Sequence, residues 1–262
     1  MVWPAIIIGL LILIWAVSLG KMHFGLGLNS KAGFLNDDRT AGGHSKKNVL
    51  LVVAHPDDET MFFSPAINYL TSRAHNLHIL CLSTGNADGI GNVRKEELYL
   101  AAAVLKIPCQ HVKVVDHPDL QDGFGKVWTT DLLVAIIEQE IHSKAIDLII
   151  TFDNYGVSGH CNHCDVQRGV RKLLQNTSLQ VEAWELVSTN IMRKYSGPLD
   201  IWLSMLLAGR CVDGQMHCVL NESPYKSYQA MAQHKSQWIW FRKLFVSFSS
   251  YTYVNTLKRM KI

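Results

Sequence analysis

The chain has 262 residues, of which 48% are hydrophobic and 18% are charged, and its formal net charge is +3 at pH 7. This length suits one large domain with an additional segment, and so small a net charge gives no basis for a nucleic-acid partner. The 6 cysteines are scattered along the chain, unlike the framework of a small secreted protein, so we expect reduced thiols.

An uncharged apolar run, VWPAIIIGLLILIWAVSL, occupies residues 2–19. As a helix it would reach about 27 Å, close to the hydrocarbon thickness of the endoplasmic reticulum bilayer. A cleaved signal peptide would start with basic residues and end in small ones, whereas here no Lys or Arg precedes the run and bulky Trp15 lies near its end. The first basic residue, Lys21, comes after the run, which places the rest of the chain in the cytosol. We therefore predict a membrane anchor at residues 2–19.

A linker rich in Gly, Asn, Asp and Ser is predicted for residues 20–47, and a single domain for residues 48–262. Short apolar runs then alternate with helical patterns. The expected strands are 48–54, 77–83, 112–115, 147–152 and 181–187, and the expected helices are 60–74, 93–105, 129–142 and 165–175. This alternation predicts an α/β fold with a mostly parallel sheet and helices on both of its faces.

Two loops carry side chains that packing alone does not call for. AHPDDE follows the first predicted strand, at residues 54–59, and FDNYGVSGHCNHCD follows the fourth, at residues 152–165. Adjacent carboxylates repel one another, and burying them is costly unless they are paired or bind a metal. Because open α/β sheets place their ligands at the carboxyl ends of strands, we expect the two loops to face one crevice.

The residue types in these loops suit a catalytic metal site. His55 with either Asp57 or Asp58 can supply two ligands, and one of His160 and His163 can complete the set. The free aspartate can then act as a base, and the free histidine can lie across the substrate. Separately, the histidines could be surface or core residues and the acids a helix N-terminus, but their joint occurrence favours a metal.

Two further motifs are weaker signals. Cys161 and Cys164 form a Cys-x-x-Cys pattern, but no second pair exists to complete a structural zinc site, so we interpret them as small residues. The stretch STGNADGIG, at residues 83–91, does not match the dinucleotide fingerprint and predicts a mobile loop at the site.

Three motifs together resemble a known family. They are AHPDDE, VRKEE at residues 93–97, and TFDNYGVSGHCNH at residues 151–163. They resemble the LmbE-like deacetylase superfamily, most closely its membrane-anchored eukaryotic branch, the N-acetylglucosaminylphosphatidylinositol de-N-acetylases of GPI-anchor biosynthesis. The resemblance covers nearly the whole chain, including SYQAMAQHKSQWIWFRKLFVSFS at residues 227–249.

The resemblance implies a Rossmann-like fold and a zinc-dependent hydrolase. His55, Asp58 and His163 would be the zinc ligands, and Asp57 would be the general base. His160 would stabilise the oxyanion or help to protonate the leaving amine.

The resemblance also implies a role for Arg94, which with Glu97 forms an arginine-x-x-glutamate pattern near the substrate. Many bacterial relatives have an acid where this chain has Asn162, between the two histidines. This difference puts in doubt the tuning of His160 by a neighbouring carboxylate, but it leaves the ligand set intact.

The implied reaction is removal of acetate from N-acetylglucosaminylphosphatidylinositol, the second step of GPI-anchor biosynthesis, at the cytosolic side of the endoplasmic reticulum membrane. Residues 235–262 are basic and aromatic, which suits either an anionic membrane interface or a packed final helix with a basic outer face; residues 199–209 could enter the membrane or the core. Two alternatives stay open: a sugar transferase using Mg²⁺ or Mn²⁺, and a catalytically inactive membrane adaptor. The sequence says nothing of protein partners.

Overall fold

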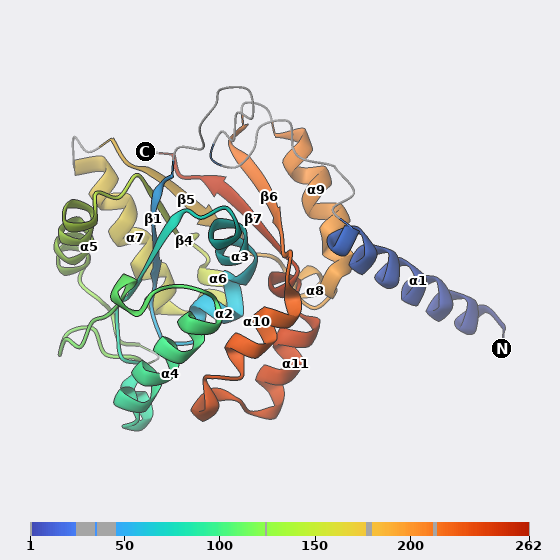
Figure 1. Cartoon of the computed structure of the whole chain (residues 1–262), viewed down its shortest axis with the longest axis horizontal. Helices are drawn as coiled ribbons and strands as arrows, with labels where there is room; N and C mark the ends of the chain where they lie inside the picture. Colours follow the sequence, from blue (N-terminus) through green and yellow to red (C-terminus); the bar gives the residue numbers. More distant parts are fainter. Residues whose placement is uncertain are drawn as a thin grey trace.

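A seven-stranded sheet forms the centre of the computed structural model, which describes residues 2–24, 35, 46–123, 125–176, 180–211 and 214–261 (Figure 1). The strands lie in the order β3-β2-β1-β4-β5-β7-β6. Their bounds are β1 Asn48–Val53, β2 Asn76–Cys81, β3 Val112–Val114, β4 Leu148–Phe152, β5 Glu182–Leu186, β6 Met216–Leu220 and β7 Val254–Arg259.

The first five strands are parallel, as predicted, and β7 and β6 extend the sheet in antiparallel fashion. Each predicted strand is present to within one or two residues at either end. The sequence analysis missed β6 and β7. Strand β7 lies inside the segment interpreted as a membrane-facing tail or final helix, and that interpretation is wrong for residues 254–259, which pair with both neighbours in the sheet.

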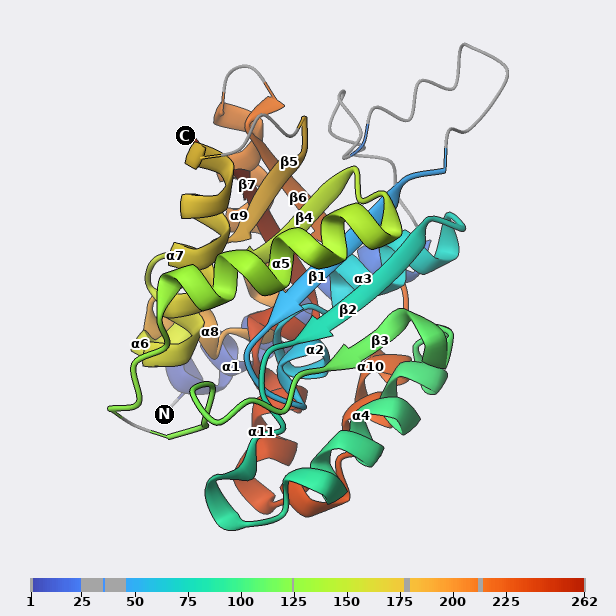
Figure 2. The same ribbon diagram turned by 90° about the vertical axis from the view of Figure 1, so that its left-hand side faces the viewer.

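Helices cover both faces of this sheet, as Figure 2 shows from the side. The described helices are α1 Val2–Phe24, α2 Asp58–Phe62, α3 Ser64–Ser72, α4 Gly91–Val104, α5 Thr130–Lys144, α6 Gly156–Gly159, α7 Cys161–Asn176, α8 Ile191–Lys194, α9 Asp200–Arg210, α10 Pro224–Met231 and α11 Trp240–Phe248. Helices α2, α3, α4 and α10 pack on one face, whereas α5 and α7 pack on the other.

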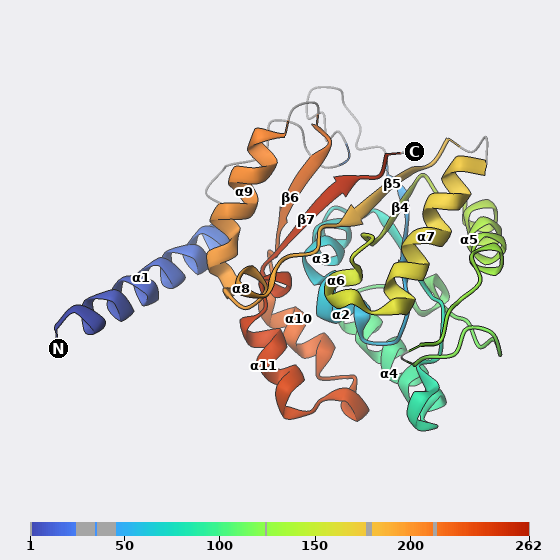
Figure 3. The ribbon, with the colours of Figure 1, turned by 180° about the vertical axis from the view of Figure 1, so that it is seen from behind.

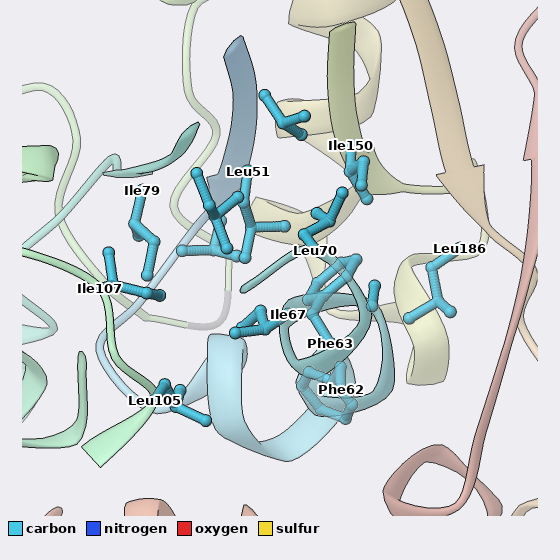
Figure 4. Packing of buried hydrophobic residues seen from close by; sticks show 14 of the residues in the cluster. Leu51, Phe62, Phe63, Ile67, Leu70, Ile79, Leu105, Ile107, Ile150 and Leu186 are labelled. Atoms are coloured by element: carbon cyan, nitrogen blue, oxygen red, sulfur yellow. The ribbon is translucent and has the colours of Figure 1, made fainter. Parts of the chain in front are cut away.

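Alternate residues of β1 point into two separate cores. Val49, Leu51 and Val53 face the core beneath α3 and α4, which Figure 4 shows, and Leu50 and Val52 face the core beneath α5 and α7. Because side chains alternate across a strand, a strand covered on both faces must be apolar throughout. This explains the unbroken apolar run before the AHPDDE motif.

Two helix boundaries differ from the prediction in ways that shape the site. The helix expected at residues 60–74 is broken at Phe63 into α2 and α3. Pro65 lies in the first turn of α3, where a backbone N–H has no partner within the helix, so the missing N–H of proline removes no hydrogen bond. Helix α7 begins at Cys161 rather than near Asp165, so His163 is a helical residue in its first turn.

Helix α1 covers the predicted anchor and continues to Phe24, into the segment predicted as a linker. Most of residues 20–47 lie outside the described residues. Within the described part of the chain, no helix combines the length and the apolar character needed to cross a membrane. The anchor at residues 2–19 and the domain bounds stay predictions.

Candidate active site

The loop after β1 turns sharply so that its two aspartates point in different directions. Asp57 has a φ of 110°, a left-handed conformation that non-glycine residues rarely adopt. Asp58 Oδ2 accepts hydrogen bonds from the backbone N–H groups of Ala54 at 3.0 Å and His55 at 2.8 Å. These bonds fix one oxygen of Asp58 and leave the other, Oδ1, facing the second loop.

The loop after β4 brings the two histidines to the start of α7. Gly156 lies at a φ of 55°, and a Cβ placed on it would lie 2.8 Å from Cβ of His163. Glycine is therefore required there by both conformation and space. Asp153, the first residue after β4, accepts a hydrogen bond from the hydroxyl group of Ser188 at 2.6 Å and so ties this loop to the segment after β5.

The two loops meet, as the sequence predicted. The ring centroids of His55 and His160 lie 4.9 Å apart and those of His160 and His163 lie 4.8 Å apart. One nitrogen from each of these three histidines lies within 4.8 Å of the others. Asp58 lies beside them, with Oδ1 3.2 Å from Nε2 of His163 and Oδ2 3.7 Å from Nδ1 of His55. Two of the predicted ligands, His55 and His163, thus belong to this group together with His160, and the third, Asp58, adjoins it.

The hydrogen bonds of His163 prepare its Nε2 to bind a cation. Its Nδ1 lies 3.1 Å from the carbonyl oxygen of Gly156 and donates to it, since a carbonyl can only accept. Nε2 is then the nitrogen that faces Asp58 Oδ1: it donates a hydrogen bond to that oxygen, and in the neutral ring its lone pair would be open to a cation placed between the two. Burial would raise the pKa of Asp58, but the neighbouring His163 and His55 outweigh it and hold that pKa below its ordinary value.

His55 is oriented in the same way through its other nitrogen. Its Nε2 lies 3.1 Å from Asp122 Oδ1 and 3.2 Å from Asn162 Oδ1, whose amide nitrogen donates to the carbonyl oxygen of Lys126. Both neighbours of Nε2 are acceptors, so it carries the proton and Nδ1 faces Asp58. Two imidazole nitrogens and a carboxylate therefore lie together, and His55, Asp58 and His163 could hold a divalent metal through the lone pairs of neutral rings.

Asp57 lies beside this cluster between two arginines. Its Oδ1 is 3.5 Å from Nη2 of Arg94, and its Oδ2 is 3.4 Å from Nη2 of Arg242. Oδ2 is buried and accepts no hydrogen bond within the described part of the chain. Burial raises the pKa of Asp57 above its ordinary value, while Arg94 and Arg242 act to lower it. A carboxylate with these neighbours can act as a base.

Arg94, predicted near the substrate, contacts several loops of the site. It donates to the carbonyl oxygens of Gly85 at 2.8 Å and Pro56 at 2.7 Å, and it lies 3.3 Å from Oδ2 of Asp122. The glycine-rich loop, predicted to be mobile, is thus held through Gly85. The φ of Gly85 is 66°, and a Cβ at this position would collide with the guanidinium group of Arg94. Arg94 is buried and therefore connects the loops that follow β1, β2 and β3.

His160 faces the cluster from the side of the second loop. Burial, followed by the like charges of His163 and His55, lowers the pKa of His160 to about 4. At neutral pH the ring is therefore uncharged and presents one N–H as a donor. This suits a group that binds a developing negative charge.

Two further residues, Asp122 and Arg242, belong to the site and were not predicted from the sequence. Asp122 follows β3, and it could have been found by the rule that located the other two loops, since it too lies beyond the carboxyl end of a parallel strand. Arg242 reaches Asp57 from α11, and no local signal in the sequence distinguishes it from the other basic residues of the C-terminal segment.

Comparison with known proteins identifies the family of this chain. The family described as PIG-L, GlcNAc-PI de-N-acetylase, matches residues 50–174. A probable N-acetylglucosaminyl-phosphatidylinositol de-N-acetylase of Dictyostelium discoideum is 34% identical over 87% of this chain and 98% of its own length. The chain belongs to the PIG-L family. This membership confirms the resemblance to the deacetylase superfamily and makes the chain a hydrolase of the deacetylase type.

Two further relatives carry the same enzyme name. A probable enzyme of the same name from Schizosaccharomyces pombe is 42% identical over 81% of this chain and 87% of its own length. The N-acetylglucosaminyl-phosphatidylinositol de-N-acetylase of Bos taurus is 38% identical over 82% of this chain and 84% of its own length.

Solved structures share the fold at low identity. A diacetylchitobiose deacetylase from Pyrococcus horikoshii superposes with a TM-score of 0.58 at 13% identity and covers 82% of this chain and 84% of its own. A zinc-inhibited form of a teicoplanin deacetylase gives a TM-score of 0.55 at 13% identity, over 82% of this chain and 99% of its own. These likenesses show a common fold and confirm the predicted α/β architecture.

Proposed function

We propose that this PIG-L protein hydrolyses the acetamide of N-acetylglucosaminylphosphatidylinositol to give acetate and glucosaminylphosphatidylinositol, the second step of GPI-anchor biosynthesis. Its relatives with this activity in their names match it over most of their length. The observation that carries the proposal is that Asp57, whose buried Oδ2 accepts no hydrogen bond among the described residues, directly precedes Asp58 in a histidine–aspartate group suited to a metal.

We propose zinc as the metal, held by His55, Asp58 and His163. Nitrogen and carboxylate donors in this combination are typical of catalytic zinc, whereas Mg²⁺ prefers oxygen alone. A bound zinc ion would polarise the amide carbonyl and make water a stronger nucleophile at neutral pH.

The chain's own residues would carry the proton transfers. Asp57 takes a proton from water as the water oxygen attacks the carbonyl carbon of the acetamide. The N–H group of His160 donates a hydrogen bond to the oxygen that becomes negative. When the C–N bond breaks, the proton held by Asp57 passes to the sugar nitrogen, which leaves as a free amine, and acetate is the other product.

We further propose that residues 2–19 anchor the protein in the endoplasmic reticulum membrane with the catalytic domain in the cytosol. The uncharged run and the basic residues that follow it support this orientation. Protease treatment of sealed microsomes tests it. Digestion of an epitope at the C-terminus without detergent is the expected result, and protection of that epitope would reverse the orientation.

The decisive experiment follows conversion of the acetylated lipid to the free-amine lipid by the purified chain and by an Asp57→Asn variant. Both are treated with a chelator and then supplied with Zn²⁺. We expect zinc to restore turnover in the parent, and the variant to be about 10²–10⁴-fold slower, because general-base catalysis contributes a factor of this size. Equal rates would refute the role of Asp57.

Two outcomes of that experiment would contradict parts of the proposal. No turnover by a folded, metal-loaded parent would indicate the inactive adaptor or another acetylated sugar. Restoration by Mg²⁺ or Mn²⁺ but not by Zn²⁺ would refute zinc as the metal and favour another divalent ion in the same deacetylase.

A further inference from the structure

Three helices near the end of the chain leave large apolar side chains uncovered. The exposed members are Ile191, Met192 and Tyr195 on and just after α8, Trp202, Leu203, Leu206 and Leu207 on α9, and Ile239, Trp240, Phe241, Leu244 and Phe248 on and just before α11. We call this set the apolar face. Trp240 is 72% exposed, although tryptophan is usually well covered in a folded protein.

On α9 and α11 the exposed side chains follow helical spacing and the opposite side of the helix is buried. On α11, Trp240, Leu244 and Phe248 recur every four residues, whereas Val246 is buried and the ring of Phe245 lies 5.7 Å from that of Phe62. On α9 the exposed leucines alternate with a buried side that includes Ile201, Ser204 and Ala208. Helices α9 and α11 therefore each have one side fixed against the protein and one exposed apolar side.

Helices α1, α9 and α11 each contact a short turn, η3 Gly197–Leu199, which follows α8 in the chain. A Cβ on Gly197 would lie 3.2 Å from Nε1 of Trp15, on α1, and 3.5 Å from the carbonyl oxygen of Phe248, on α11. Trp202 of α9 donates a hydrogen bond to the hydroxyl group of Ser18, on α1, at 2.8 Å. Figure 3 shows α1, α8, α9 and α11 along one edge of the molecule. The apolar face is therefore continuous with exposed apolar residues of α1, among them Leu10 and Leu13.

Basic side chains accompany this face. Lys235 and Lys243 are exposed, and Nζ of Lys243 lies 5.5 Å from the ring centre of Trp238. Residues 235–261 contain no acid. Exposed tryptophan and phenylalanine beside lysine and arginine are typical of a surface that enters the headgroup region of a membrane with anionic lipids.

Helix α11 also joins this face to the catalytic site. Arg242 lies between the exposed residues in sequence, yet its guanidinium group turns inward to Asp57. A lipid lying against α11 would therefore have its headgroup close to the base that acts on it.

We propose that the apolar face is a membrane seat: it rests in the interfacial layer of an anionic bilayer and holds the catalytic site at the lipid surface, whether or not α1 spans the membrane. The occupant is lipid because the face combines aromatic and basic residues and continues along α1. The crosslinking test of this inference does not depend on the proposed lipid substrate. The turnover test rests on the proposed function, because it measures hydrolysis of that substrate.

Photo-crosslinking of the full-length protein in phosphatidylcholine–phosphatidylserine vesicles tests the seat directly. Benzoylphenylalanine is placed at Trp240 and, as a matched control, at Val127, which is 75% exposed and adjoins Trp128 in the core beneath α5. We expect phospholipid adducts at position 240 and few at position 127. A crosslink to a second copy of the chain, no adduct at 240, or equal adducts at both positions would overturn the proposal. Phe241 provides a second labelling position if the first variant does not fold.

Turnover gives an independent readout. We expect Phe241→Ser combined with Leu244→Ser to hydrolyse substrate in vesicles about tenfold more slowly than the parent, with no change on the same headgroup lacking lipid tails. Val127→Ser should leave both rates unchanged. Equal losses on both substrates would contradict the seat, because they indicate damage to the catalytic site. If the parent hydrolyses neither substrate, the proposed function fails, while the crosslinking result still decides the seat.

Discussion

The neighbours of Asp57 and Asn162 determine the chemical properties of these two side chains. Asp57 is buried, and it stays within reach of two guanidinium groups that oppose the effect of burial on its pKa. Asn162, between the two histidines of the second loop, contacts Nε2 of His55 through its side-chain oxygen. At the residue scale, each of these contacts predicts a measurable change.

Replacing Arg242 should make Asp57 a base that works only at higher pH. In Arg242→Gln the opposing charge is lost, so the pKa of Asp57 rises further above its ordinary value. Since the base must be deprotonated, we expect the acid limb of kcat/KM to move to higher pH, measured with the substrate lacking lipid tails. Arg259→Gln, which removes an exposed arginine paired with Glu182, is the control. An unchanged acid limb in Arg242→Gln would refute the link.

Replacing Asn162 should weaken metal binding without removing a ligand. Asn162→Leu leaves Nε2 of His55 with one acceptor fewer and no longer joins it to Lys126. Loss of such an orienting partner typically lowers metal affinity about 10–100-fold. Zn²⁺ affinity by chelator competition measures the change, and Asn76→Leu, at an exposed pair with Asn48, should have no effect. Equal affinities in parent and Asn162→Leu would show that Asn162 does not orient the ring.

At the scale of elements, the start of α7 is positioned by its contact with the turn before it. Gly156 and Gly159 both have positive φ, but only Gly156 lies against His163. Both alanine variants should lose about 1–2 kcal/mol of unfolding free energy from the left-handed backbone. Gly156→Ala should also displace His163 and lose Zn²⁺ affinity, whereas Gly159→Ala, with open space around its Cβ, should keep it. Denaturant unfolding and metal titration separate these effects. Equal metal affinity in the two variants would contradict this account.

At the scale of the whole molecule, the C-terminal segment is joined to the first half of the chain by buried polar bonds. The carboxylate of Glu97, on α4, accepts from the N–H of Ser236 at 2.7 Å and from its hydroxyl group at 2.6 Å. The arginine-x-x-glutamate pattern thus has a structural partner far along the chain.

Ser236→Ala should therefore destabilise the protein, because it leaves a buried carboxylate oxygen without a donor. A loss of about 1–3 kcal/mol in the free energy of unfolding is expected. Ser247→Ala removes an exposed hydroxyl group bonded only to the backbone of its own helix and should change stability by less than about 0.5 kcal/mol. Urea unfolding measures both, and similar losses in the two variants would show that the Glu97 bond is unimportant.

The sequence by itself determined the parallel core of the sheet and most of the site. Strand and helix periodicity are local properties, and parallel strands bring their carboxyl ends to one edge, so AHPDDE and GHCNH had to meet. The broken helix at Phe63 and the early start of α7 were missed, since helix ends depend on contacts beyond the periodic pattern.

Contacts from distant parts of the chain support the two site loops, and these depend on tertiary packing. His234 lies 2.7 Å from Glu59 across a separation of 175 residues, and Arg242 reaches Asp57 from the same segment. The basic and aromatic composition of residues 235–262 was visible in the sequence, but its division into α11 and a strand of the sheet was not. Such contacts depend on how whole elements pack, and spacing along the chain carries no record of that packing.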